Sequence, residues 1–331
     1  MTSDSVGASS VLIPEITVRR LFEDRQETLQ LEVLNSEVGL ERRVVDPDIT
    51  SPGIALAGYT ERFSSDRIQV FGETEISYLQ GLTPEERRDR VKGVFDFGIP
   101  VAFVTKGLPV PDEFLEVARE CSIPILRSGL GTKEFYRRIK PYLDAVLAPR
   151  TNLHGSLADV YGVGLLFVGE SGVGKSECVL DLVERGHRLV ADDHVIVSRR
   201  GPDILLGEGH QLQAHHMEIR GLGIIDIRTL FGIHATRQQK RIEVMVHLER
   251  WDESGSYTRT GLDTTESEVL GIMVPKITIP LNAGKNITVI SEVVAMNHLL
   301  KYAGIHSAAA FNERLKEAIR PVHEYFEQDY E

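Results

Sequence analysis

The sequence predicts an α/β protein with a small layered domain, followed by a second domain that contains a phosphate-binding loop and ends in helices. The chain has 331 residues, more than the ~100–200 residues typical of one domain. Strand-like and helix-like segments alternate through its first part, which favours parallel strands covered by helices. In its second part, a glycine-rich loop separates an apolar strand from a helix. We therefore predict domains at residues 1–131 and 132–331.

In the first domain, Ala55–Thr60 and Ile68–Phe71 are expected to form short strands. A helix is expected after Thr83, which can cap its N-terminus, with Pro84 in the first turn and Glu86 completing a capping box. The remaining expected elements are strands at Pro100–Thr105 and Pro124–Arg127, with a helix at Asp112–Cys121 between them.

The second domain is expected to be rich in strands. A long helix at Thr132–Pro149 links the two halves or opens the second one. The strand Val163–Val168 and the helix Ser176–Arg185 flank the glycine loop, and Gly186 ends that helix. The other expected strands are His187–Ser198, Arg241–Leu248, Lys276–Leu281 and Ile287–Val294, followed by helices near Ala295–Tyr302 and His306–Glu327.

The composition limits the possible partners and compartments. A net charge of −12 argues against a broad nucleic-acid surface, which needs clustered Lys and Arg. No apolar run approaches the length of a membrane span, and the N-terminus lacks the pattern of a signal peptide. Cys121 and Cys178 are the only cysteines, which favours a reducing compartment. We expect a cytoplasmic protein that binds neither nucleic acid nor membrane.

The glycine loop has the pattern G-x-x-x-x-G-K-[ST] of a nucleotide-binding phosphate loop. Its residues are Gly169, Glu170, Ser171, Gly172, Val173, Gly174, Lys175 and Ser176. Glycines allow the backbone to curl so that successive N–H groups face one anion, and the following helix adds its positive end. Lys175 is expected to reach the outer phosphates and Ser176 to ligate Mg²⁺. A chance match in a chain of this length is expected about once in a hundred sequences.

Asp192 and Asp193 stand in the middle of the apolar strand expected at His187–Ser198. Adjacent carboxylates are costly there unless they bind a metal or take part in chemistry. Their apolar flanks argue against a surface turn. Since side chains alternate across a strand, only one of the two should face the loop, and spacing alone does not choose between them.

Three further polar residues are candidates for the active site, although their sequence context is less specific. Glu218, near two glycines, could be a buried second metal ligand or a surface salt-bridge partner. His154 precedes Gly155 beside the strand that leads into the phosphate loop. Arg259 lies in a polar loop, where an isolated arginine is usually a solvated charge.

These motifs together resemble the HPr kinase/phosphorylase family, a bifunctional bacterial regulator of the sugar phosphotransferase system. The resemblance covers nearly the whole chain. In order, the second half contains NLHGSLADVYGVGLLFVGESGVGKSE, LVADDHV, HMEIRGLGIID, YTRTGLD and ISEVVAMN. The first half contains GYTERFSSDRIQVFGETEISYLQGLTPEERRDRV and FGIPVAFVTKGLPVPDEF, which resemble the family's N-terminal domain.

The resemblance implies roles for individual residues. Lys175 and the loop hold the nucleotide phosphates, and Ser176 and Glu218 are metal ligands. Asp193 corresponds to the general base, which accepts the proton of a serine hydroxyl. His154 is the active-site histidine.

The resemblance also implies that Arg259 neutralises developing phosphate charge. The residues that support the catalytic region are Asp192, Arg220, Gly221 and Gly223. Family members use ATP or pyrophosphate with Mg²⁺ to phosphorylate a serine of the partner protein HPr, and they remove that phosphate by phosphorolysis. They assemble as hexamers, and their kinase core resembles that of phosphoenolpyruvate carboxykinase.

Two departures from the family pattern stand out. His194 follows the aspartate pair, where the family usually has arginine. The segment linked to dephosphorylation in the family, usually Pro-Val-Arg-Pro-Gly-Arg, consists here of Pro280, Leu281, Asn282, Ala283, Gly284 and Lys285. Since guanidinium groups hold phosphate well, we expect kinase activity to be retained and phosphorylase activity to be reduced.

Two alternatives remain open on the sequence. One is an enzyme of another class, either a phosphate-loop kinase acting on a small molecule or a carboxykinase-like enzyme. The other is a nucleotide-gated regulator without turnover, in which Asp193 is dispensable. Transfer of phosphate to HPr, and its loss on substitution of Asp193, distinguishes these readings.

Overall fold

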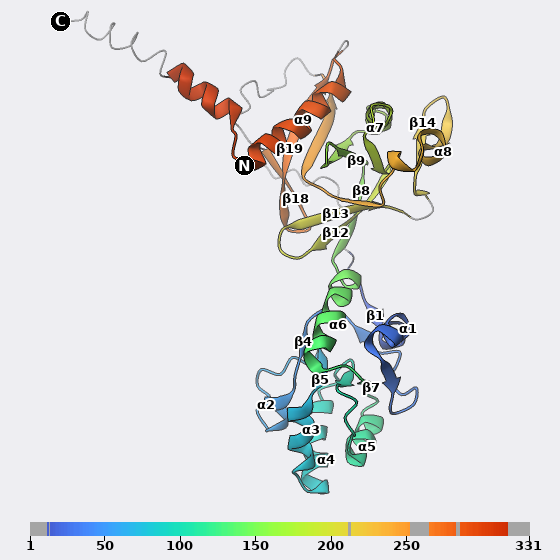
Figure 1. The fold of residues 1–331 in the computed structure, drawn as a ribbon, viewed down its shortest axis with the longest axis vertical. Helices are drawn as coiled ribbons and strands as arrows, with labels where there is room; N and C mark the ends of the chain where they lie inside the picture. The colour runs from blue at the N-terminus through green and yellow to red at the C-terminus, as the bar shows by residue number, and fades with distance from the viewer. Residues whose placement is uncertain (1–11, 13, 211–212, 252–264, 283–284, 317–331) are drawn as a thin grey trace, which may run out of the picture. The chain divides into compact units, whose positions relative to one another are not determined.

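The computed structural model describes residues 12, 14–210, 213–251, 265–282 and 285–316 (Figure 1). One compact unit spans Leu12–Pro149, and the other is built from Arg150 onward. No helix in these ranges is long and apolar enough to cross a membrane.

The first unit is built on a five-stranded sheet with the strand order β2-β7-β6-β5-β4. Its strands are β2 (Leu31–Val33), β4 (Ile49–Thr50), β5 (Ile68–Phe71), β6 (Ala102–Val104) and β7 (Ile125–Ser128). The pairs from β4 to β7 are parallel, and β2 joins β7 antiparallel. The parallel pairing expected from the alternating elements is therefore confirmed.

Helices cover both faces of this sheet. Along β6, the side chain of Phe103 packs with α1 and α6, whereas those of Ala102 and Val104 pack with the helices of the other face. The first face carries α1 (Val18–Leu29) and α6 (Thr132–Val146), and the second α2 (Gly53–Leu56), α3 (Glu73–Gln80), α4 (Pro84–Phe95) and α5 (Asp112–Glu120). A short antiparallel pair, β1 (Ile16–Thr17) with β3 (Arg43–Val44), completes the unit.

The capping box predicted at Thr83 is confirmed, but one strand predicted in the first unit is wrong. The hydroxyl of Thr83 accepts a hydrogen bond from the N–H of Glu86, whose carboxylate accepts one in return. The strand expected at Ala55–Thr60 is instead α2 and the turn after it. The N–H of Leu56 donates to Pro52 to close a helical turn, and this buries Leu56 among the helices of the second face. The burial of Leu56 against neighbouring helices thus outweighs the strand-like composition of this segment.

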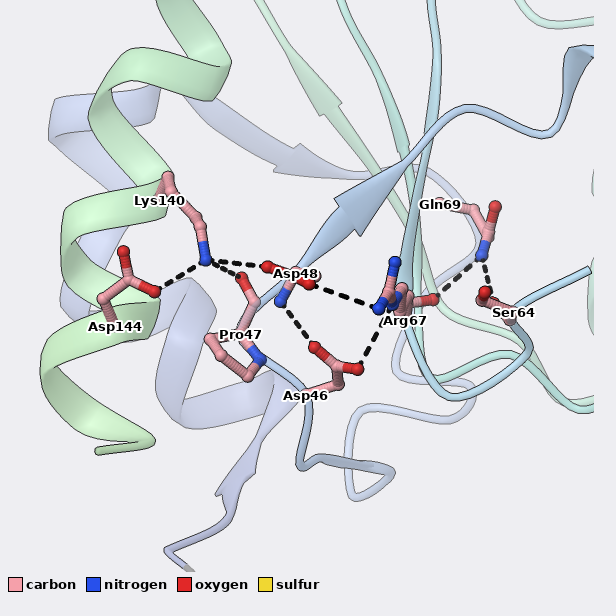
Figure 2. A network of polar contacts seen from close by, with 8 residues as sticks. All are labelled: Asp46, Pro47, Asp48, Ser64, Arg67, Gln69, Lys140 and Asp144. Atoms are coloured by element: carbon pink, nitrogen blue, oxygen red, sulfur yellow. Dashed lines mark hydrogen bonds and ion pairs between the residues drawn. The ribbon is translucent and has the colours of Figure 1, made fainter. Parts of the chain in front are cut away.

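The boundary expected after residue 131 falls later, because α6 belongs to the first unit. Phe135 and Ile139 of α6 are fully buried in that unit's core. Figure 2 shows the polar network that joins α6 to the start of β4. Lys140 Nζ donates to Asp48 at 2.9 Å and to Asp144 at 2.6 Å, and Arg67 pairs with the other oxygen of Asp48 at 3.2 Å.

The second unit contains a six-stranded sheet with the order β11-β9-β10-β17-β19-β18. Its central strands β10, β17 and β19 are parallel, and the outer pairs are antiparallel. The strands are β9 (Ser156–Val160), β10 (Val163–Gly169), β11 (Arg188–Ala191), β17 (Val244–Arg250), β18 (Thr265–Val269) and β19 (Ile272–Leu281).

A four-stranded antiparallel sheet packs against one face of the six-stranded sheet. Its order is β16-β13-β12-β8, from β8 (Arg150–His154), β12 (His194–Arg200), β13 (Ile204–Gly209) and β16 (Gln239–Arg241). Apolar side chains of both sheets form one buried cluster. A separate hairpin of β14 (His216–Ile219) and β15 (Gly223–Asp226) leads into α8 (Ile227–Phe231) and a 3₁₀ turn (Ile233–Ala235).

Helices α7 (Lys175–Glu184) and α9 (Ile287–Tyr302) cover the other face of the six-stranded sheet. The strand expected at Ile287–Val294 is therefore wrong, because α9 begins there. The side chain of Asn286 caps this helix by accepting from Val289 N–H. Residues 307–316 are also helical, as expected, and the rest of that predicted helix lies outside the described residues.

Candidate nucleotide and phosphoryl-transfer site

The phosphate loop lies between β10 and α7, the context expected from the sequence. Gly169, Gly172 and Gly174 all have positive φ, at 146°, 76° and 103°. A side chain at Gly169 would also collide with the backbone oxygen of Leu248 on the neighbouring parallel strand. Only glycine meets both demands at that position, so the curled loop follows from the sequence.

Lys175 begins α7 and is largely buried. Its ammonium group donates to the backbone oxygens of Gly169 at 3.1 Å and Glu170 at 2.9 Å, so it lies folded over the loop. Burial lowers the pKa of Lys175, while the nearby carboxylates of Asp193 and Asp192 oppose the shift. A bound phosphate group would offer this cation a stronger partner than the two carbonyl oxygens.

The strand expected at His187–Ser198 is interrupted at the aspartate pair. Strand β11 ends at Ala191 in the six-stranded sheet, and β12 begins at His194 in the four-stranded sheet. Asp193 has a φ of 63°, and its carbonyl accepts from the N–H of Gly155 at 3.0 Å. Because the chain changes sheets here, strand alternation does not apply, and both carboxylates line the pocket of the phosphate loop.

Asp192 is buried against the loop. Its Oδ1 accepts hydrogen bonds from Ser156 at 2.6 Å and from Ser176 at 3.0 Å. Its Oδ2 is buried and has no hydrogen-bond partner among the described residues. Burial raises the pKa of the Asp192 carboxyl, and its hydrogen bonds with the two serines oppose this shift.

This environment of Asp192 fits Mg²⁺. A buried carboxylate oxygen without a partner costs free energy unless a cation or a donor satisfies it. Mg²⁺ prefers oxygen ligands, and the Ser176 hydroxyl lies beside the same carboxylate. Glu218, the second metal ligand expected from the family, is exposed rather than buried, but it lines the same pocket.

Asp193 faces solvent and lies between two imidazoles. Its Oδ1 is 3.1 Å from His154 Nδ1, and its Oδ2 is 3.3 Å from His194 Nε2. About half of its side chain is exposed. The carboxylate is thus open to an incoming substrate, as a general base must be, and His154 is in contact with it.

The β14–β15 hairpin closes one side of the pocket. Gly221 in its turn and Gly223 at the start of β15 both have positive φ, at 84° and 93°. The guanidinium of Arg220 lies so close to Gly172 that a Cβ there would collide with it. Arg220 therefore adds a positive charge directly above the phosphate loop.

The segment 280–285, which the resemblance links to dephosphorylation, lies partly within the described residues. Pro280 and Leu281 end β19, while Asn282 and Lys285 are exposed. Lys285 and Gly174 line one pocket next to the phosphate loop. Ala283, Gly284 and the candidate Arg259 lie outside the described residues.

One pocket brings together most of the residues expected from the sequence. It is lined by His154, Ser156, Ser171, Gly172, Gly174, Lys175, Ser176, Glu177, Asp192, Asp193, Glu218 and Arg220. Two features of the site were not predicted from the sequence, namely Ser156 and the contact of His194 with Asp193. Ser156 lies two residues after His154, but nothing in that spacing reveals a hydrogen bond to a residue 36 positions away.

Comparison with known proteins matches both parts of the chain to one family. A model described as "HPr Serine kinase C-terminal domain" matches residues 145–315, and one described as "HPr Serine kinase N terminus" matches residues 16–143. The chain belongs to the HPr serine kinase family. The resemblance and the two-domain α/β architecture expected from the motifs are confirmed.

Relatives within the HPr serine kinase family match along nearly the whole chain. The HPr kinase/phosphorylases of Bacillus cereus (strain B4264) and Bacillus mycoides (strain KBAB4) are each 44% identical over 307 residues. These matches cover 93% of this chain and 98% of each relative. A solved structure, the Hpr(Ser) kinase/phosphatase from Coxiella burnetii, is 32% identical, covering 49% of this chain and 98% of its own, with a TM-score of 0.44.

Proposed function

We propose that this chain transfers a phosphoryl group from ATP or pyrophosphate to a serine of the phosphocarrier protein HPr. The observation that carries this proposal is that the phosphate loop and the exposed carboxylate of Asp193 line one pocket. A site of this kind can hold a phosphoryl donor and a hydroxyl acceptor side by side. The family membership and the names of the relatives supply the identity of the acceptor.

In this proposal each group has one task. The backbone N–H groups of the loop, together with Lys175 and Arg220, hold the donor phosphates. Asp193 accepts the proton of the acceptor hydroxyl, and His154 orients its carboxylate. Ser176, Asp192 and Glu218 hold Mg²⁺, which neutralises phosphate charge when bound.

The test is incubation with purified HPr, Mg²⁺ and either donor, followed by mass spectrometry of HPr. We expect one added phosphate on a serine. Phosphate appearing on a metabolite instead of HPr would favour the small-molecule kinase, and nucleotide binding without transfer would favour the regulator.

The two cysteines are unpaired, which supports a reducing compartment, so we propose that the reaction takes place in the cytoplasm.

We also propose that the chain acts as a homo-oligomer, in the hexameric form implied by the family resemblance. An apolar row along α9 supports this assembly. Val289, Val293, Met296 and Leu300 recur at helical spacing and are each 40–51% exposed. Light scattering coupled to size-exclusion chromatography is expected to give the mass of six chains, and a monomer at assay concentration would contradict the proposal.

Phosphorolysis is expected to be slower than phosphorylation in this chain. Arginine can hold a protein-bound phosphate with two parallel hydrogen bonds, which neither Asn282 nor Lys285 can provide. Lys285 Nζ also lies 5.4 Å from the ring centre of Trp251, in a position to be held by a cation–π contact.

The variant Asn282→Arg is expected to raise the phosphorolysis rate several-fold. A change of this size corresponds to a lowering of the activation free energy by about 1 kcal/mol. The rate is measured as phosphate loss from seryl-phosphorylated HPr in the presence of inorganic phosphate. The forward rate of the same variant serves as the internal control. Phosphorolysis in the parent that already matches the forward rate would refute the proposed weakening.

A further inference from the structure

Two imidazoles and a carboxylate meet at the pocket, apart from the hydrogen-bonded oxygen atoms of Ser176 and Asp192. His154, Asp193 and His194 each offer one ligand atom, and these atoms lie within 4.8 Å of one another. The imidazole nitrogens are 3.1 Å and 3.3 Å from the two carboxylate oxygens. Neighbouring ligands of a tetrahedral zinc ion are about 3.3 Å apart, so small side-chain rotations would bring all three onto one ion.

The backbone holds these three residues together. His154 of β8 and His194 of β12 are direct partners across an antiparallel pair, so their side chains emerge on the same face. The left-handed backbone of Asp193 places its side chain between the two imidazoles. A hydrogen bond from Gly155 N–H to the carbonyl oxygen of Asp193 holds this backbone conformation. The ligands are therefore arranged by β-sheet pairing and not by chance contacts of long side chains.

The chemistry of the three groups selects the ion. Two imidazole nitrogens and one carboxylate suit Zn²⁺, Co²⁺ or related transition ions, whereas Mg²⁺ prefers oxygen ligands only. Three protein ligands leave a coordination position open, and the roughly half-exposed side chains give an ion access from solvent. The neighbouring side chains of Ser176 and Asp192 offer only oxygen atoms, which are the ligands that Mg²⁺ prefers.

We propose that His154, Asp193 and His194 form a transition-metal site that switches off phosphoryl transfer. An ion bound there takes up the carboxylate oxygens of Asp193, which then cannot accept the proton of the acceptor serine. This consequence rests on the proposed role of Asp193 as the base. The metal site itself does not depend on that role, so the two are tested separately.

Cobalt titration tests the site without any catalytic readout. Co²⁺ added to the metal-free full-length protein, in excess Mg²⁺, is expected to bind one equivalent, to give visible absorption bands and to be displaced by Zn²⁺. His194→Arg keeps a cation beside Asp193 but removes a ligand, and it is expected to weaken Co²⁺ binding roughly tenfold or more. The matched control His306→Arg changes an exposed histidine elsewhere and is expected to bind Co²⁺ as the parent does. Equal Co²⁺ affinity in His194→Arg and the parent, or no bound Co²⁺ in the parent, would overturn the site.

Inhibition by zinc tests the switch. In excess Mg²⁺ and ATP, Zn²⁺ is expected to suppress phosphate transfer to HPr by the parent, and a zinc-selective chelator to restore it. The ratio of rates with and without Zn²⁺ is compared within each variant, and His194→Arg is expected to lose most of the inhibition. Zinc that binds without inhibiting would overturn the switch but not the site. A parent that transfers no phosphate to HPr even without Zn²⁺ would refute the proposed function, while the cobalt result would still decide the metal site.

Discussion

Replacing Asp193 with asparagine is expected to lower the rate of phosphate transfer to HPr by a factor of about 10²–10⁴, the usual contribution of a positioned general base. Asparagine has nearly the same shape but cannot accept the proton. It also tolerates the left-handed backbone that Asp193 adopts, at a φ of 63°, so the change of sheets should be preserved. The loss should therefore reflect chemistry and not folding.

The measurement combines the initial rate of transfer with the affinity for nucleotide. The affinity of Asp193→Asn for ATP is expected to stay within about threefold of the parent's, since the loop and Lys175 are unchanged. Asp203→Asn, in the exposed turn between β12 and β13, is the matched control and should transfer at the parent rate. If Asp193→Asn transferred within about threefold of the parent's rate, Asp193 would not be the base.

The phosphate loop could be predicted almost completely because its signal is local. Three glycines, a lysine and a serine at fixed spacing specify both a backbone shape and the chemistry it holds. The capping box at Thr83 is a similar case, since the atoms that bond are three residues apart. In both, the interacting residues are close in the sequence.

The arrangement around the aspartate pair could not be predicted for the opposite reason. The chain leaves one sheet at Ala191 and enters another at His194, and pairing with β9 and β8 decides this change. The apolar residues on both sides of the pair suit either sheet. The sequence therefore indicates one continuous strand with one carboxylate facing the loop, whereas both carboxylates line its pocket.

Helix α9 shows tertiary packing overriding local propensity. Its first residues, Ile287–Val294, include several β-branched side chains that favour a strand. Yet Thr288, Ser291 and Ala295 are buried at a spacing of three and four, which is helical. The cap at Asn286 was a local signal that could have corrected the prediction.

Glu292 links α9 to the end of α7 and to the strand that follows. Its carboxylate receives two hydrogen bonds from Arg185, at 3.0 and 2.7 Å, and lies 3.0 Å from His187 Nε2. Both Glu292 and His187 are buried. The hydrogen bonds from Arg185, helped by His187 and opposed by burial, lower the pKa of Glu292 from 4.5 to about 2.

Replacing Glu292 with glutamine is therefore expected to lower the unfolding free energy of this unit by about 2 kcal/mol at pH 7. The pKa difference alone corresponds to about 3 kcal/mol, and the exposure of Arg185, 47%, reduces that figure. For a unit of this size the melting temperature should fall by roughly 4–8 °C. Thermal unfolding followed by the fluorescence of Trp251, the single tryptophan of the chain, reports on this unit.

The pH dependence provides the sharper test, because a lowered carboxyl pKa stabilises the fold only when the group is ionised. The contribution is complete above pH 4.5, the ordinary value, and is lost as the pH falls towards 2. The stability difference between the parent and Glu292→Gln should thus be constant near neutrality and shrink below pH 4.5. Glu184→Gln, an exposed residue of α7, is the control and should match the parent throughout. A stability difference between the parent and Glu292→Gln that stayed the same down to pH 3 would show that the ionised carboxylate does not hold α9 in place.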